Sequence, residues 1–384
     1  MSQFDSILSS MKAESFHAKK QLLEYTLHIV QNILKNQPTL KYLDKVAILN
    51  YAYSEVDDFQ SAIASAETYK EKDLIFTCED LLLGLIMTLC PKSEEISPEN
   101  LAKIQRLVDT VAKERYIENA LDDLFKQETI DEAEVGNLLS LVRQTDDEYQ
   151  KGMLYSGLVH YKEDVAKISD AGKTLIAAHL VAEFKRYLSQ EQLNEDCVNN
   201  LEVAVDICKY FANDELIAIL GRVLELGYSN VNYYAIDSLL SVGQDVPADI
   251  IISLSKSLAY ANLTYAMLGK FGKQNLFPQE CATPEYLAKS DLVHWLMYPT
   301  ELGQEPDEIE YIGKITYLFK KEVYFVFKYR SNSDTLDENL KNKWLIGWSS
   351  EDGGTFSNFD EYALFEKKSL NATLKNIKKK LIGS

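Results

Sequence analysis

The sequence predicts a mainly α-helical chain that ends in a small α+β module with a three-stranded antiparallel sheet. Apolar residues recur at helical spacing from Phe4 to about Trp295, and they alternate at strand spacing from Tyr311 onward. Between these regions, the segment 274–313 holds four of the eight prolines. We call this segment the join, and we predict a helical array over residues 1–300 and an α+β module over residues 301–384.

Composition supports a folded chain and restricts the class of partner. Hydrophobic residues make up 46% of the 384 positions, which is enough for a core and excludes wholesale disorder. The formal net charge of −19 repels phosphate backbones, so we expect no nucleic-acid binding over the main body. A local basic stretch stands apart from this pattern, because the segment from Lys367 to the last residue has six lysines and no acid.

Cysteine usage and the apolar runs predict a cytoplasmic protein without a membrane span. The five cysteines stand singly, with no CxxC pair, which favours reduced and buried thiols. The first residues, MSQFDSILSSMKAES, have neither a basic nor an apolar signal region. The most apolar run, Leu81–Cys90, is about half as long as a helix that crosses a bilayer.

The first part of the helical array shows apolar stripes and helix-start signals. Ser97 followed by Pro98 predicts a capped helix N-terminus. Thr129 and Thr145, each followed by acids, predict two further starts, because acids favour the positive end of a helix. The predicted helices are 23–34, 38–53, 73–90, 97–111, 129–143, 145–161, 169–188 and 194–211.

The later helices are shorter and are separated by glycines. We predict helices at 213–226, 230–242, 247–258 and 262–271, three of which end just before Gly227, Gly243 and Gly272. A glycine at this position closes a helix in the left-handed conformation at little cost. The pair Tyr234-Ala235 recurs as Tyr265-Ala266 at an offset of 31, a length typical of helical-pair repeats.

These features carry a family resemblance. The stretch DELIAILGRVLELGYSNVNYYAIDSLLSVGQDVPADIIISLSKSL has one helix, a short turn, an alanine-centred second helix and a terminal glycine. It resembles HEAT-type repeats over about residues 213–272. The resemblance implies a right-handed α-α superhelix, or solenoid, whose concave face binds protein partners, and it implies no catalytic residues.

After the join, the alternation predicts strands. Residues 311–319 and 323–329 form a predicted β-hairpin, and Trp344, Ile346 and Trp348 mark a third strand. Leu370, Leu374, Ile377 and Leu381 predict a final amphipathic helix that covers one face of the sheet. We expect strand pairing only after Leu276.

The motifs of catalysis and metal binding are incomplete. Gly172-Lys173-Thr174 imitates the end of a phosphate-binding loop, but Lys167 stands where the loop needs a glycine. The five histidines form no HExxH motif and no cluster with metal-ligand spacing. We therefore predict no catalytic residues, no metal and no cofactor.

The preferred hypothesis is a non-enzymatic interaction protein that binds a protein with a basic surface. Tyrosine suits interfaces because it combines contact area with a polar tip, and carboxylates steer a basic partner. The alternative interpretation of the tyrosines is packing between helical layers, and that of the carboxylates is a solvated linker. The candidate partner-binding residues are Tyr233, Tyr234, Tyr265, Trp295, Glu301, Glu305, Asp307 and Glu308.

Two other functions stay open. An enzyme would place its site in the α+β module or between that module and the helices, and convergence of Tyr311, Trp344 and Trp348 on one pocket would favour it. An acidic neutralising protein, of the immunity type, would bind a basic partner through the net charge alone.

Overall fold

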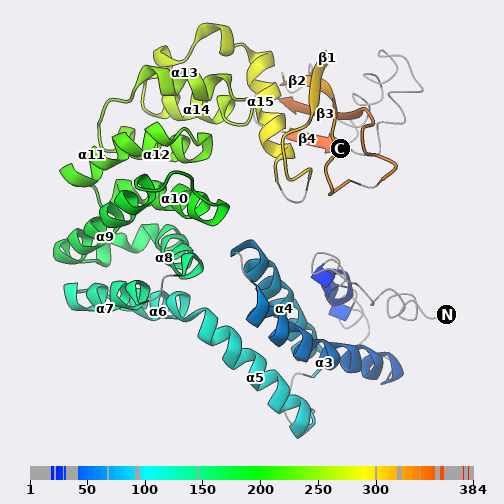
Figure 1. Ribbon diagram of the computed structural model, residues 1–384. Helices are drawn as coiled ribbons and strands as arrows, with labels where there is room; N and C mark the ends of the chain where they lie inside the picture. Colours follow the sequence, from blue (N-terminus) through cyan, green and yellow to red (C-terminus); the bar gives the residue numbers. More distant parts are fainter. Residues whose placement is uncertain are drawn as a thin grey trace. The chain divides into compact units, whose positions relative to one another are not determined.

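The computed structural model describes most of the chain as two compact units (Figure 1). Unit 1 comprises Met1–His179 and Gln192–Asn200, and unit 2 comprises Leu180–Glu191 and Leu201–Ser384. The described residues are 19–20, 23–28, 30–31, 42–66, 69–90, 96–144, 147–298, 301–317, 322–336, 338–350, 355–358, 375 and 379. Among them, no helix is both long and apolar enough to cross a membrane.

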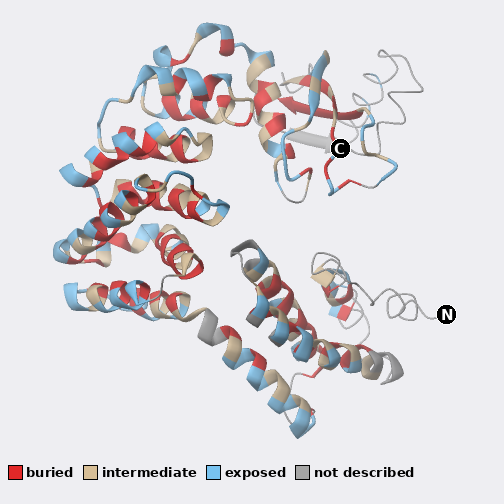
Figure 2. Ribbon diagram, viewed as in Figure 1, coloured by how far each residue is buried: buried red, intermediate tan, exposed pale blue. Residues whose placement is uncertain are grey.

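Unit 1 is built from helices whose apolar stripes face one another, and Figure 2 shows the buried residues along those facing sides. The interior includes Val56, Phe59, Leu82 and Leu85, all fully buried. The helices are α3 (Tyr42–Ser65), α4 (Tyr69–Leu89), α5 (Pro98–Glu114), α6 (Tyr116–Phe125), α7 (Glu132–Arg143) and α8 (Glu148–His160), followed by the 3-10 helix η2 (Lys162–Lys167).

The helix starts of unit 1 confirm one predicted cap and correct two. Ser97 caps α5 by accepting a hydrogen bond from the backbone N–H of Asn100, with Pro98 at the first helical position. The predicted starts at Thr129 and Thr145 were wrong, because Asp131 and Asp147 are the capping residues of α7 and α8. A carboxylate accepts from the first free N–H groups at least as well as a threonine hydroxyl.

Backbone pairing in unit 1 corrects the expectation that strand pairing occurs only after Leu276. The N–H of Ile130 donates to the carbonyl of Lys167, and the N–H of Ser169 donates to the carbonyl of Ile130, both at 2.9 Å. These bonds form an isolated parallel bridge between the buried residues Ile130 and Ile168. The bridge gives their backbone polar groups partners without extending into a strand.

Unit 2 begins within α9 (Asp170–Leu188) and continues through helices that pack on their neighbours in chain order, an arrangement consistent with a solenoid. The helices that follow α9 and precede the sheet are α10 (Glu195–Ile207), α11 (Asp214–Val223), α12 (Ser229–Ser241), α13 (Ala248–Lys256), α14 (Ala261–Lys270) and α15 (Pro284–Leu296). Short 3-10 helices lie between them: η3 (Cys208–Tyr210), η4 (Leu224–Leu226), η5 (Gln274–Leu276) and η6 (Gln279–Cys281).

The predicted helix-closing glycines adopt the left-handed conformation. Gly227, Gly243 and Gly272 have φ angles of 79°, 77° and 67°. After α12, the N–H of Gln244 donates to the carbonyl of Leu239, and after α14, the N–H of Lys273 donates to that of Leu268. Both bonds are of the six-to-one type that closes a helix at such a glycine.

Polar contacts between every second helix of unit 2, or between the segments that follow those helices, recur at nearly constant separation along the chain. Glu202 and Asn230, Lys209 and Asp237, and Asp245 and Lys273 are each 28 residues apart. Lys185 and Glu215 are 30 apart, and Tyr286 contacts the carbonyl of Ser255 across 31. A nearly constant separation is consistent with a solenoid of stacked helices.

The C-terminal sheet contains the three predicted strands and one more. The strands β1 (Glu308–Tyr317), β2 (Glu322–Arg330), β3 (Leu345–Ser350) and β4 (Thr355–Asn358) pair in chain order, each antiparallel to the next. Sequence analysis missed β4. The predicted hairpin turn at Lys320 and Lys321 lies outside the described residues.

A bulge in β1 changes which residues share a face of the sheet. Tyr311 pairs with Phe327, but the register then shifts and Gly313 pairs with Val326. Side chains opposite one another lie on the same face, so Tyr311 shares a face with Phe327, and Ile315, opposite Tyr324, lies on the other. The unbroken alternation predicted from Tyr311 to Ile315 was therefore wrong.

The join is largely structured and belongs to the core of the sheet region. The helix α15 occupies its middle, and Leu292 and Leu296 of α15 pack with Phe325 and Phe327 of β2. Phe277 is buried, whereas Leu276 and Trp295 are exposed. The core around α15 thus crosses the boundary predicted at residue 300.

The opposite face of the sheet has its own apolar cluster of Ile315, Val326, Ile346 and Trp348. The predicted final helix over Leu370–Leu381 lies outside the described residues, apart from Lys375 and Lys379.

Candidate partner-binding surface

Three half-buried tyrosines of unit 2 form one aromatic cluster. Tyr233 and Tyr234 are neighbours near the start of α12, and Tyr260 directly precedes α14. The ring centroids of Tyr233 and Tyr234 lie 5.1 Å apart with the planes at 77°, and those of Tyr233 and Tyr260 lie 5.9 Å apart. The edge-to-face contact is a favourable geometry, and it turns ring faces in different directions.

The end of α15 adds two exposed aromatic side chains. Trp295 is 38% exposed and Tyr298 is 50% exposed, and their ring centroids are 6.0 Å apart. The ring of His294 lies 5.6 Å from that of Tyr298, also edge-on. Large aromatic groups at this level of exposure are typical of binding surfaces when they lie together.

The electrostatic environment links these groups. Burial, with a smaller contribution from Asp237, raises the pKa of Tyr233 to about 12. Burial also raises the pKa of Tyr260, with contributions from Glu202 and Glu305. The raised pKa of Tyr234 has the same main cause, with smaller contributions that include Glu202 and Tyr298. Glu202 of α10 and Glu305 after α15 therefore act electrostatically on the tyrosine cluster.

We define the tyrosine surface by the residues just described. It comprises Tyr233, Tyr234, Tyr260, Trp295, Tyr298, Glu202 and Glu305.

Two lysines beside this surface are held by other carboxylates. Lys209 Nζ lies 2.5 Å from Asp206 Oδ1 and 2.9 Å from Asp237 Oδ2. Lys270 Nζ is 3.5 Å from the other oxygen of Asp237. Among the described residues, neither Glu202 nor Glu305 has an ion-pair partner, although Asn230 donates a hydrogen bond to Glu202. The net charge of these two lysines and the four carboxylates is therefore negative.

Tyr265 lies apart from the cluster. Its ring packs against the buried Phe277 at 5.2 Å with the planes at 72°. This contact fastens the start of the join to α14, so Tyr265 matches the packing interpretation of the tyrosines.

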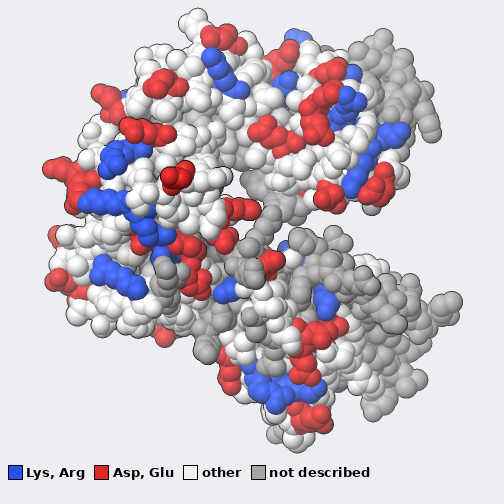
Figure 3. All heavy atoms as spheres, viewed as in Figure 1, with Lys and Arg blue, Asp and Glu red and all other residues white. Residues whose placement is uncertain are grey.

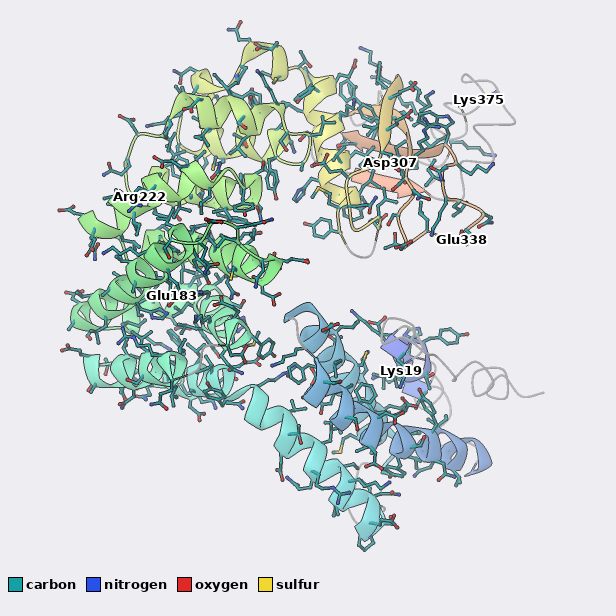
Figure 4. The ribbon with its side chains drawn as sticks, in the orientation of Figure 1. Lys19, Glu183, Arg222, Asp307, Glu338 and Lys375 are labelled. Carbon is teal, nitrogen blue, oxygen red and sulfur yellow. The ribbon has the colours of Figure 1, made fainter. Side chains whose placement is uncertain are left out.

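The four carboxylates predicted from sequence also do not act together, because two of them bind groups of the sheet region. Asp307, labelled beside the sheet in Figure 4, accepts a hydrogen bond from the backbone N–H of Asn332 at 2.8 Å. Glu308 pairs with Arg330 across the first two strands. Glu301 is half-buried, and Glu305 is exposed. Of the four acids proposed from sequence, Glu305 contributes to the raised pKa of Tyr260.

Sequence reasoning missed Glu202 and Tyr298, and it considered Tyr260 among the tyrosines of the late helices without including it in the candidate set. Glu202 carried one usable signal, because it precedes Asn230 by the 28 residues that separate other contacting residues of unit 2. Tyr298 carried no comparable local signal. The proximity of Tyr260 and Tyr298 to α12 depends on how α14 and α15 pack.

Acidic and basic side chains are interspersed over the face in Figure 3. Among the described residues, no group of three or more His, Cys, Asp or Glu side chains is placed to hold a metal ion. Gly172 is a packing residue, since a Cβ atom there would lie 2.9 Å from Ile168 Cγ2 and 3.0 Å from Val135 Cγ2.

The aromatic residues of the sheet do not converge on one site. Tyr311 contacts the rings of Phe325 and Phe327 on the α15 side, whereas Trp348 belongs to the cluster on the other side. Trp344 makes two cation–π contacts, with Lys328 Nζ 4.0 Å and Arg330 Cζ 5.1 Å from its ring centroid. The grouping that would favour an enzyme is thus split between the two faces.

Comparison of the chain with protein-family models, with curated proteins and with solved structures found no match in any of the three. Its function must therefore be inferred from its own residues.

Proposed function

We propose that the protein is a non-enzymatic interaction protein with HEAT-like helical repeats, and that it binds a protein partner through the tyrosine surface. The observation that carries this proposal is the exposure of the paired rings of Trp295 and Tyr298, with Tyr298 near enough to the half-buried Tyr234 to contribute to its raised pKa. Rigid aromatic groups provide contact area at low entropic cost, and a partly buried surround excludes water from the contact.

The repeat part of the proposal draws on the spacing of contacts. Separations of 28 to 31 residues recur between contacting residues of every second helix, or of the segments that follow those helices. Repeated helical pairs present equivalent faces side by side, which suits extended contact with another protein.

Charge favours a basic partner. The chain carries 59 acidic and 40 basic residues, and Glu202 and Glu305 bring negative charge to the tyrosine surface. Steering by such charges raises the association rate, and salt screens it over about 8 Å at ~0.15 M ionic strength. We place the protein in the cytosol in this proposal, because all five cysteines are buried and none of them forms a disulfide among the described residues.

The test is capture of partners from the native cell extract by four forms of the full chain. The wild type and Ile252→Ala, which truncates an exposed residue of α13, serve as the matched pair. We expect Trp295→Ala and Tyr298→Ala to lose at least one protein that both controls retain. The same set of captured proteins for all four forms would contradict the proposal.

A kinetic measurement on any partner so identified separates anchoring from steering. We expect Tyr298→Ala to raise the dissociation rate, because it removes contact area. We expect Glu305→Gln to lower the association rate, with an effect that fades as salt rises. Binding that is indifferent to salt and to both substitutions would place the surface elsewhere.

A further inference from the structure

The chain itself shows how it pairs cations with aromatic rings. In each of the eight such contacts among the described residues, the cation that lies over the ring also pairs with a carboxylate. Arg186, for example, lies with its Cζ 4.3 Å from the ring centroid of Tyr187 and pairs with Glu183 at 2.8 Å. The remaining cations are Lys19, Lys72, Arg115, Lys209, Lys270, Lys328 and Arg330.

The physical reason is that the two attractions add. A ring face is negative because of its quadrupole, and a carboxylate carries a full charge, so a cation placed between them is stabilised by both. A protein that provides an aromatic ring beside a carboxylate can therefore bind a cation that comes from another molecule.

The tyrosine surface provides both the rings and the carboxylates for a cation from another molecule. Tyr233 and Tyr234 meet at 77°, so they present faces in two directions, and Tyr260 extends the cluster from α14. Glu202 accepts a hydrogen bond from Asn230, which lies one helical turn before Tyr233 and Tyr234 on α12. Glu202 and Glu305 also both contribute to the raised pKa of Tyr260. The neighbouring Lys209 and Lys270 are bound to Asp206 and Asp237, which leaves the negative charge of Glu202 and Glu305 uncompensated by an ion pair among the described residues.

We propose that Tyr233, Tyr234 and Tyr260, together with Glu202 and Glu305, bind an arginine side chain of the partner protein. This inference rests on the proposed function and names the group that the surface recognises. Arginine suits the site better than lysine, because its planar guanidinium stacks on a ring and still donates hydrogen bonds in its own plane to carboxylates. The ammonium of lysine is a compact and strongly hydrated charge.

The first experiment compares three amidated hexapeptides, of arginine, lysine and citrulline, by titration against the full chain at ~0.15 M salt. Citrulline has nearly the shape of arginine without its charge. We expect the arginine peptide to bind at least ~3-fold more tightly than the lysine peptide, and the citrulline peptide to bind at least ~30-fold more weakly than the arginine peptide. Equal affinity for the arginine and lysine peptides would overturn the inference, because net charge alone would then explain binding.

The second experiment locates the bound peptide on the protein. We expect Tyr260→Leu to weaken arginine-peptide binding ~5-fold, and Tyr260→Phe, which keeps the ring, to change it less than ~2-fold. Tyr265→Leu is the matched control, because Tyr265 lies outside the cluster. If Tyr260→Leu and Tyr265→Leu weaken binding equally, the cluster does not hold the guanidinium.

A charge substitution guards against misfolding of the tyrosine variants. Glu305 is exposed, so Glu305→Gln leaves the core untouched, and Glu280→Gln removes an equal charge from an exposed position of η6. We expect Glu305→Gln to weaken arginine-peptide binding ~3-fold and Glu280→Gln to have less than half that effect. Equal effects of the two substitutions would overturn the assignment of Glu305.

The two proposals fail in different ways. If no captured protein depends on Trp295 and Tyr298, the proposed function fails, whatever the peptides do. A second outcome is that such a partner is found, that the arginine peptide does not compete with the partner for the protein, and that Tyr260→Leu leaves the affinity for the partner unchanged. In that case the proposed function stands and the arginine inference is overturned.

Discussion

The hydroxyl group of Ser349 on β3 donates a 2.7 Å hydrogen bond to Oδ2 of Asp291 on α15. The other oxygen of the same carboxylate accepts a 3.1 Å hydrogen bond from Nδ2 of Asn262 on α14. One side chain therefore connects two helices and the sheet. These hydrogen bonds add a polar attachment to the apolar core in which Leu292 and Leu296 of α15 pack with residues of β2.

We predict that Asp291 stabilises the attachment of the sheet to the helices. Asp291→Ala should lower the free energy of unfolding by about 2 kcal/mol, because hydrogen bonds to a charged group contribute about 1.5–3 kcal/mol. The exposed Glu280→Ala is the control. A double-mutant cycle with Ser349→Ala should show coupling, and strictly additive effects would mean that the two side chains do not stabilise each other.

The contact between Lys209 and Asp237 should contribute more to stability than its counterpart between Lys273 and Asp245. Both pairs span 28 residues, but the side chains of Lys209 and Asp237 are 17% and 13% exposed, whereas Asp245 is fully exposed. We expect Asp237→Ala to cost about 2 kcal/mol, since it removes one partner of a largely buried charge. Asp245→Ala should change little. Denaturant unfolding of both variants is the measurement, and equal losses would contradict the role assigned to burial.

Glu79 predicts a pH dependence in unit 1. Its side chain is 2% exposed, and burial, aided by Asp80 and opposed by Arg115, raises its pKa from 4.5 to about 7. A carboxyl whose pKa is higher in the folded state holds its proton while the unfolded chain loses it. The free energy of unfolding should therefore fall as pH rises from 4.5 to about 7, by up to about 3 kcal/mol.

Glu79→Gln should remove this dependence and exceed the wild type in stability above pH 7. The exposed Glu128→Gln is the matched control and should follow the wild-type profile. Unfolding measured at intervals of pH decides between them. Parallel profiles for wild type and Glu79→Gln would show that this carboxyl does not titrate in the predicted range.

The second face of the sheet allows a test of the segment 370–381. Ile315, Val326, Ile346 and Trp348 on that face are buried, and the sequence predicts that the amphipathic segment covers them. Truncation at Lys368 should then lower the melting temperature, with a loss of several kcal/mol at about 25 cal/mol per Å² of apolar surface.

Trp348 reports on that face directly. In a Trp295→Phe, Trp344→Phe background, truncation should shift its fluorescence to longer wavelength and increase quenching by acrylamide. The background protein without truncation is the control. An unchanged spectrum and melting temperature would show that the segment does not cover the sheet.

The sequence by itself determined most of the helices, several of their ends and three of the four strands, because these depend on residues close together in the chain. Ser97 and Pro98 start α5, and Gly243 and Gly272 close α12 and α14 in the left-handed conformation. Periods of 3.6 and 2 distinguish helix from strand over a few turns or residues.

Only the tertiary structure decided which residues meet. The bulge in β1 separates Tyr311 from Ile315, and its position depends on pairing with β2. Arg330 and the backbone of Asn332 bind Glu308 and Asp307, while Glu305 acts on Tyr260. These interactions join residues 22 or more positions apart, and no local pattern encodes them. They arise because packing of the apolar stripes brings particular polar groups of distant segments into reach of one another.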